Sequence, residues 1–267
     1  MELKYKALIT DFDGTLVDEN LQLPDGVKDA IGRLQKENFK IIMATGRAYL
    51  GAVQRTGEEL GLVDPQIVLD GTEIVDPRTE EILWSEHIPQ LTSKELVDFL
   101  IKKGFRFRAE VGNFGYFNNM PVPEDDSKLV LRDVSQMPNF DLAKIILYLS
   151  EEEEVREVEE KLRAKYENLR FFRNSRNSPI RYLTILSAKA SKQVAVEELR
   201  RRLGLDRNQL IGAGNSYNDH PLLMATKFRV TTANAPQELR DIADMVVPPP
   251  DERGLLVLFE KLLDGLM

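Results

Sequence analysis

Short apolar stretches alternate with helical stretches at both ends of this chain, and this alternation most constrains its fold. The runs Ala7–Thr10, Lys40–Ala44 and Gln66–Leu69 have the length of buried strands, and apolar residues recur at helical spacing from Val27 to Leu34. Successive strand–helix–strand units build a parallel sheet with helices on both faces. The sequence therefore predicts an α/β fold.

The middle of the chain follows a different pattern. A helical stretch at about Thr92–Lys103 leads into short alternating segments, which is typical of an antiparallel α+β arrangement. The strand–helix alternation resumes after residue 188. We therefore predict a core formed by residues 1–85 and 188–267, with residues 86–187 inserted as an α+β domain. The strands expected in the insertion lie at Phe105–Arg108, Phe114–Phe117, Lys144–Tyr148, Leu169–Phe172 and Arg181–Ile185.

Composition narrows the classes of partner. The formal net charge of −8 argues against a surface for nucleic acid or an anionic membrane, which favours small-molecule partners. No stretch approaches the roughly 20 apolar residues that cross a bilayer, and residues 1–6 lack the apolar segment of a signal peptide. We expect a cytoplasmic protein. The absence of cysteine excludes disulfides and a thiol nucleophile, and the sequence is silent on oligomeric state.

Two carboxylates follow the first expected strand. Because residues i and i+2 of an extended chain point to the same side, Asp11 and Asp13 face one cleft while Phe12 turns away. One carboxylate can attack an electrophile covalently, and the other can donate a proton to a leaving group and later accept one from water. Read alone, Asp-x-Asp-Gly is also an ordinary turn after a strand.

With its continuation Gly14-Thr15, this segment resembles the first motif of the haloacid dehalogenase (HAD) superfamily of phosphohydrolases. Counterparts of the other family motifs follow in order at Ala44–Arg47, Ala190–Gln193 and Gly212–Asp219. The resemblance covers the whole chain. In the core it includes the specific residues of the motifs, whereas in the insertion it is limited to the arrangement of helices and strands. It implies a Rossmann-like, doubly wound core with a cap of type IIB, as in the Cof-type branch.

The second motif contains Thr45 and Gly46 at the end of an expected strand. A Thr at this position can cap a helix or, with the Gly46 N–H, hold a phosphate oxygen. The resemblance favours phosphate binding. Asp70, at the end of the next strand, can touch substrate or simply form a turn with Gly71.

The third motif supplies Lys192, at the start of a helix whose apolar face we assign to Val194, Val196 and Leu199. Most lysines are solvated surface groups. The resemblance instead implies that Lys192 bridges the nucleophile and the phosphate, where an ammonium would offset crowded carboxylates.

The fourth motif can be aligned in two registers. Starting at Gly212 places Ala213 where a polar ligand belongs, so we adopt the register that starts at Gly214. It retains Asn218, assigned to phosphate binding, and Asp219, but replaces the family's first metal-binding aspartate with Asn215. The implied Mg²⁺ ligands are Asp11, the Asp13 backbone carbonyl, Asn215 and Asp219, which provide the oxygen atoms that Mg²⁺ prefers.

The resemblance implies a Mg²⁺-dependent phosphatase that hydrolyses a small phosphorylated metabolite, of the sugar phosphate or phosphoglycolate type, through an aspartyl-phosphate intermediate. Asp11 is the expected nucleophile, Asp13 the acid and base, and Lys192 the third catalytic residue. Two alternatives remain. One is a phosphomutase with the same core. The other is a weakly catalytic phosphometabolite-binding protein, which is suggested by the replacement of the carboxylate at residue 215.

Overall fold

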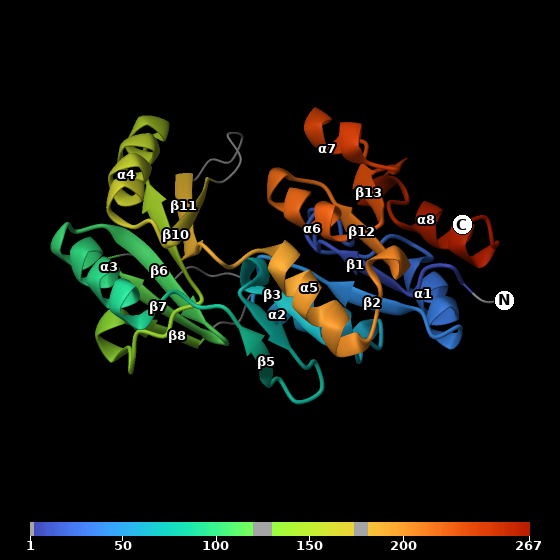
Figure 1. The fold of residues 1–267 in the computed structure, drawn as a ribbon, viewed down its shortest axis with the longest axis horizontal. Coiled ribbons are helices and arrows are strands. Elements are labelled where there is room, and N and C mark those ends of the chain that lie inside the picture. Colours follow the sequence, from blue (N-terminus) through green and yellow to red (C-terminus); the bar gives the residue numbers. More distant parts are fainter. Residues whose placement is uncertain (1–2, 120–129, 174–180) are drawn as a thin grey trace. The chain divides into compact units, whose positions relative to one another are not determined.

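The computed structural model describes residues 3–119, 130–173 and 181–267 (Figure 1). The chain divides into two compact units, one formed by Met1–Leu83 with Ser191–Met267 and the other by Trp84–Ala190. Residues 120–129 and 174–180, which belong to the predicted insertion, lie outside the described residues.

The first unit is built on a five-stranded sheet with the strand order β14-β13-β12-β1-β2. Every neighbouring pair in it is parallel. The central strand β12 (Leu210–Gly214) and its neighbour β1 (Ala7–Thr10) consist of buried residues, as expected for strands covered by helices on both faces of the sheet. The predicted α/β class with a parallel core is confirmed. The strands are β1 (Ala7–Thr10), β2 (Lys40–Met43), β12 (Leu210–Gly214), β13 (Phe228–Thr232) and β14 (Met245–Val247).

Helices connect these strands, and α1 packs beside α8 while α5 packs beside α6. The helices of this unit are α1 (Val27–Lys36), α2 (Gly51–Glu59), α5 (Lys192–Leu203), α6 (His220–Ala225), α7 (Gln237–Ile242) and α8 (Leu256–Leu263). A bridge between Ala44 and Ile67 continues the sheet edge toward a small sheet of β3 (Gln66–Val68), β4 (Glu73–Val75) and β5 (Ile82–Ser85).

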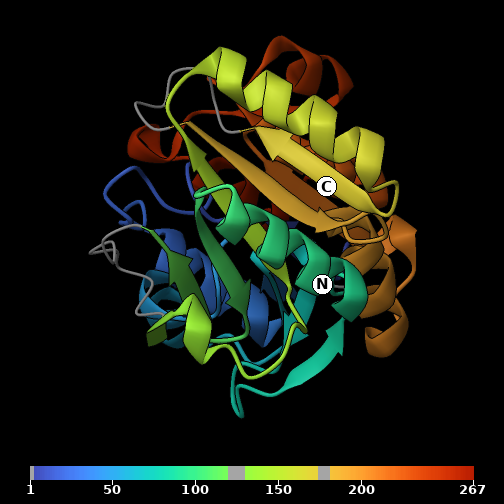
Figure 2. The same ribbon diagram turned by 90° about the vertical axis from the view of Figure 1, so that its left-hand side faces the viewer.

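The second unit is an α+β sandwich, as expected for the insertion. Its six-stranded sheet has the order β10-β11-β9-β6-β7-β8, and one face is covered by α3 (Gln90–Lys102) and α4 (Glu152–Lys165) (Figure 2). The strands are β6 (Arg106–Val111), β7 (Phe114–Asn118), β8 (Val130–Asp133), β9 (Lys144–Leu149), β10 (Leu169–Arg173) and β11 (Arg181–Ser187). The sequence did not predict β8, which pairs with β7 in parallel.

The apolar face assigned to α5 needs one correction. Val194 is exposed, and the buried face instead contains Lys192, Ala195, Val196 and Leu199. Residues three and four apart share a helix face, whereas 194 and 196 do not. The helical period therefore places Lys192 on the buried side of α5.

No helix among the described residues has the length and apolar character that crossing a membrane requires.

Candidate active site

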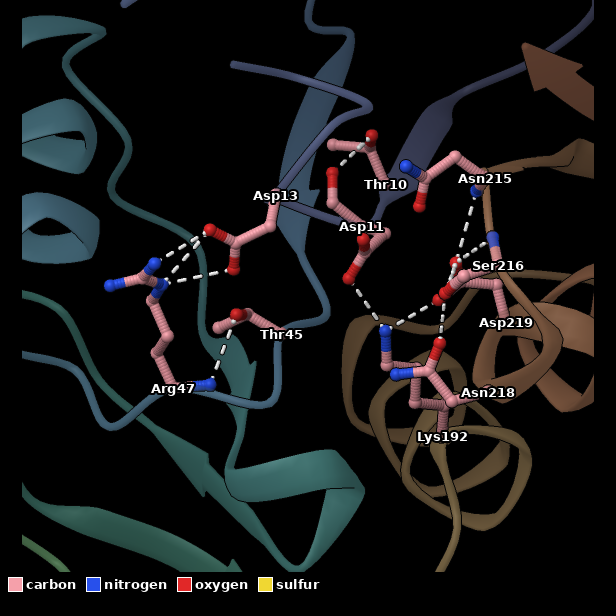
Figure 3. Close-up of polar contacts among 10 residues, drawn as sticks. All are labelled: Thr10, Asp11, Asp13, Thr45, Arg47, Lys192, Asn215, Ser216, Asn218 and Asp219. Atoms are coloured by element: carbon pink, nitrogen blue, oxygen red, sulfur yellow. Dashed lines mark hydrogen bonds and ion pairs between the residues drawn. The ribbon is translucent and has the colours of Figure 1, made fainter. Parts of the chain in front are cut away.

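Polar side chains gather at the carboxyl ends of the parallel strands. Thr10, the last residue of β1, lies opposite Ala213 of β12 on one side and Met43 of β2 on the other. Asp11 directly follows β1, and Asn215 directly follows β12. In Figure 3 the Asn215 side chain points toward Asp11. This edge is where ligands bind in open parallel sheets.

A buried ion triad forms the centre of this group. The Lys192 Nζ donates to Asp11 Oδ1 at 2.7 Å and to Asp219 Oδ1 at 2.6 Å (Figure 3). Only 2% of the Lys192 side chain and none of the Asp219 side chain is exposed. One ammonium thus lies between two carboxylates, and the triad carries an excess negative charge.

Burial and the neighbouring charges shift the pKa values of both Asp11 and Lys192. Burial, with the nearby charge of Asp219, raises the pKa of Asp11 to about 7 against the opposing effect of Lys192. Burial also acts to lower the pKa of Lys192, but the charges of Asp11 and Asp219 together outweigh it and raise that pKa. Lys192 is therefore a fixed cation, while Asp11 is a carboxylate whose charge is only partly compensated.

Local backbone structure holds the triad in place. Ser191 caps α5, with its hydroxyl accepting a hydrogen bond from the Val194 N–H at 3.2 Å, so the helix begins at Lys192. On the other side, Asp219 Oδ2 accepts hydrogen bonds from the Asn215 and Ser216 N–H groups, each at 3.0 Å. Both oxygens of Asp219 are engaged, which fixes its orientation.

Asp13 belongs to a separate ion pair. Arg47 Nε donates to Asp13 Oδ1 at 3.0 Å and to Oδ2 at 2.9 Å, and Arg47 Nη2 donates to Oδ1 at 2.8 Å. Such a fork binds both oxygens of a carboxylate in one plane. Nearly half of the Asp13 side chain is exposed. Asp13 is therefore an oriented carboxylate that solvent can reach.

The Thr45 hydroxyl is buried and accepts a hydrogen bond from the Arg47 N–H at 3.1 Å. This contact bends Thr45–Arg47 into a tight turn between β2 and α2. The same segment thus contains both predicted phosphate ligands, Thr45 and Gly46, and the arginine that orients Asp13.

Direct hydrogen bonds join only some of the predicted site residues. Asp11, Lys192 and Asp219 form the triad, and Asn215 joins it through its backbone. Asn218 is exposed, and its side-chain oxygen accepts from the Ser216 hydroxyl.

Sequence reasoning gave no role to Arg47 or Ser216. Arg47 is the last residue of the second motif, Ala44–Arg47, and its place beside Thr45 and Gly46 could have indicated a role in the site. Ser216 offered no signal beyond its place beside Asn215.

Metal ligands are few in this site. Among residues 3–119, 130–173 and 181–267, no three acidic or histidine side chains gather as a metal site on their own. Within these ranges, no residue donates a hydrogen bond to Asp11 Oδ2 or bonds the Asn215 amide. A methyl group on Gly14 would lie 2.3 Å from Asn215 Nδ2, so that amide packs directly on the loop after β1. The free oxygens therefore suit one hard cation that keeps several waters.

The chain is similar to known proteins along nearly its whole length. The family model for haloacid dehalogenase-like hydrolases matches residues 8–258. The putative phosphatase YxeH of Bacillus subtilis is 25% identical over 97% of this chain and 98% of its own length. Phosphoglycolate phosphatase 1 of Saccharolobus solfataricus is 36% identical, over 28% of this chain and 33% of its own.

Solved structures share the fold. TM0651 from Thermotoga maritima superimposes with a TM-score of 0.82 at 20% identity and covers 96% of this chain and 97% of its own. The HAD subclass IIB sugar phosphatase BT4131 gives a TM-score of 0.79 at 21% identity and covers 98% and 100%.

Lys192→Met is expected to lower the free energy of unfolding by about 3–5 kcal/mol at neutral pH, because it leaves two buried carboxylates without a cation. Protonation removes this repulsion, so the loss should shrink at acidic pH, below the raised pKa of Asp11. Urea unfolding in the presence of a chelator measures both values. Lys36→Met, on the exposed face of α1, is the matched control. Equal stability of the Lys192 variant and the wild type at neutral pH would contradict the burial of an ion triad.

Proposed function

Because the chain belongs to the haloacid dehalogenase-like hydrolase family, we propose that it hydrolyses small phosphomonoesters through a phosphorylated Asp11. The observation that carries the proposal is the state of the Asp11 carboxylate. Lys192 fixes Oδ1, and Oδ2 accepts no hydrogen bond from any described residue. A carboxylate oriented in this way can direct one oxygen at phosphorus.

In the first step, Asp11 Oδ2 bonds to phosphorus while the bond from phosphorus to the ester oxygen breaks. Asp13 gives its proton to the departing alkoxide. In the second step, Asp13 takes a proton from water, the water oxygen bonds to phosphorus, and the Asp11–phosphorus bond breaks to release phosphate. The Arg47 fork orients the Asp13 carboxylate that accepts this proton.

Four residues are proposed to bind the phosphoryl group. Lys192 supplies positive charge beside Asp11, and Thr45 and Gly46 supply a hydroxyl and an N–H from the turn after β2. Asn218, at the exposed rim, supplies its amide. Because Lys192 stays protonated, its charge is present throughout the cycle.

We assign Mg²⁺ to Asp11, the Asp13 backbone carbonyl, Asn215 and Asp219. The excess negative charge of the triad supports this assignment, as do the oxygens of Asp11 and Asn215 that accept no hydrogen bond from a described residue. When bound, the ion would offset the negative charges of the carboxylates and the phosphate.

The substrate class rests on the relatives. BT4131 is named a sugar phosphatase, and the Saccharolobus protein a phosphoglycolate phosphatase. We propose a small phosphorylated metabolite of one of these types. We further propose that the Trp84–Ala190 unit is the cap that selects among leaving groups.

Asp11→Asn is expected to reduce kcat by on the order of a thousandfold or more while the fold is retained, because an amide cannot form the phosphoenzyme. Hydrolysis of p-nitrophenyl phosphate and a panel of phosphometabolites measures the loss, and circular dichroism checks the fold. Asp29→Asn, on the exposed face of α1, should behave like the wild type. Wild-type turnover by a folded Asp11→Asn protein would refute the nucleophile assignment.

Asn215→Asp is expected to lower the Mg²⁺ concentration that gives half-maximal activity, because a carboxylate adds net charge to the ligand set. The added charge also repels the incoming phosphate, so saturated kcat should change less. Mg²⁺ titration of both proteins at fixed substrate separates the two effects. If the Mg²⁺ concentration for half-maximal activity were the same or higher in the Asp variant, Asn215 would not be a Mg²⁺ ligand.

A further inference from the structure

A left-handed turn follows β3 and has no part in the chemistry described above. Leu69, Asp70 and Gly71 have φ angles of 49°, 62° and 85°. Only glycine enters this region without steric cost, yet the first two residues carry side chains. Surrounding contacts must therefore hold the turn in this conformation.

On one side the turn is hydrogen-bonded to the Thr45–Arg47 segment. The Leu69 N–H donates to the Arg47 carbonyl, and the Asp70 N–H donates to the Thr45 carbonyl, each at 3.0 Å. Between these two bonds lies Gly46, and a methyl group on it would lie 2.9 Å from Asp70 Oδ1. The turn thus holds the residues on both sides of Gly46, and the Asp70 carboxylate packs against Gly46 itself.

On its other side the turn packs against the start of α5. A methyl group on Gly71 would lie 2.5 Å from the Lys192 backbone nitrogen and 2.5 Å from the Ser191 carbonyl carbon. Only a residue without a side chain can approach this peptide bond so closely. The position of the turn therefore fixes the peptide from which the Lys192 side chain projects.

We infer that Asp70 and Gly71 are positioning residues, which hold the Thr45–Arg47 segment and Lys192 at the spacing that phosphate binding requires. The inference rests on the proposed function. The turn contacts the backbone at two residues that orient the carboxylates of the site. Arg47 orients Asp13, and Lys192 orients Asp11. Asp70 acts through Gly46 and its neighbours, and it needs no contact with substrate.

The choice of variant separates positioning from stability. Gly71→Ala would collide with backbone atoms and could unfold the protein. Asp70→Gly instead relieves the left-handed conformation while it removes the carboxylate. Asp70→Asn retains an oxygen acceptor of the same shape and tolerates the same φ.

Glu80 supplies the matched control. It is an exposed acidic residue with a φ of 59°, in the connection between β4 and β5. Glu80→Gly therefore also removes a carboxylate and relieves a left-handed backbone conformation, but outside the site.

Three quantities are measured for each protein in Mg²⁺-containing buffer: Tm, kcat/KM for p-nitrophenyl phosphate, and the Kd of inorganic phosphate by calorimetry. Asp70→Gly should keep or raise Tm, lower kcat/KM by about ten- to a hundredfold and weaken phosphate binding, since small misplacements of a site are costly. Asp70→Asn should recover most of both functions, and Glu80→Gly should match the wild type in both.

Wild-type phosphate binding and turnover in Asp70→Gly would overturn the inference while leaving the proposed function intact. Failure of Asp70→Asn to recover either function would also overturn it. If the wild type binds phosphate but hydrolyses no phosphomonoester, the proposed function fails, and the phosphate Kd values still test the turn. Absence of phosphate binding by the wild type would overturn both.

Discussion

The site depends on burying one ammonium between two carboxylates. Removing Lys192, Asp11 and Asp219 from water is costly, and only close contacts recover that cost. The distances of 2.7 and 2.6 Å require three separate chain segments to meet at one point. The parallel pairing of β1 with β12 brings two of them to the same sheet edge, and the capped start of α5 delivers the third.

Around this buried centre the site becomes progressively more open to solvent. Asp11 is buried, Asp13 is about half exposed and Asn218 lies at the exposed rim. This gradient suits the proposed division of labour. A nucleophile benefits from a fixed, water-poor environment, whereas a group that exchanges protons with water must reach it. The Arg47 fork orients Asp13 without burying it.

Sequence patterns predicted the elements whose formation depends on neighbouring residues, namely the strands and helices. The apolar run before Asp11 is recognisable as a strand. The i, i+2 rule applies only within that strand, which ends at Thr10, and Asp11 and Asp13 beyond it enter separate ion pairs. The contact between Lys192 and Asp11 joins residues 181 positions apart, so the sequence could suggest it only through family resemblance. The helical period of α5 contained the information that Lys192 shares a face with Ala195 and Leu199. The expected face of Val194, Val196 and Leu199 did not include Lys192. The turn at Leu69 and Asp70 was beyond prediction in its details, because leucine disfavours the conformation that its neighbours impose.

The central claim is that Asp11 carries the phosphoryl group between the two steps. Rapid acid quenching of the enzyme during turnover of a phosphomonoester with a radiolabelled phosphate tests this directly. One portion of the quenched protein is mapped for labelled peptides, and a second portion is reduced with borohydride and mapped for homoserine. The account predicts acid-stable label on the peptide that follows Lys6, and conversion of residue 11 to homoserine only when substrate is present. Turnover without labelled protein, or label and homoserine at another residue, would contradict it.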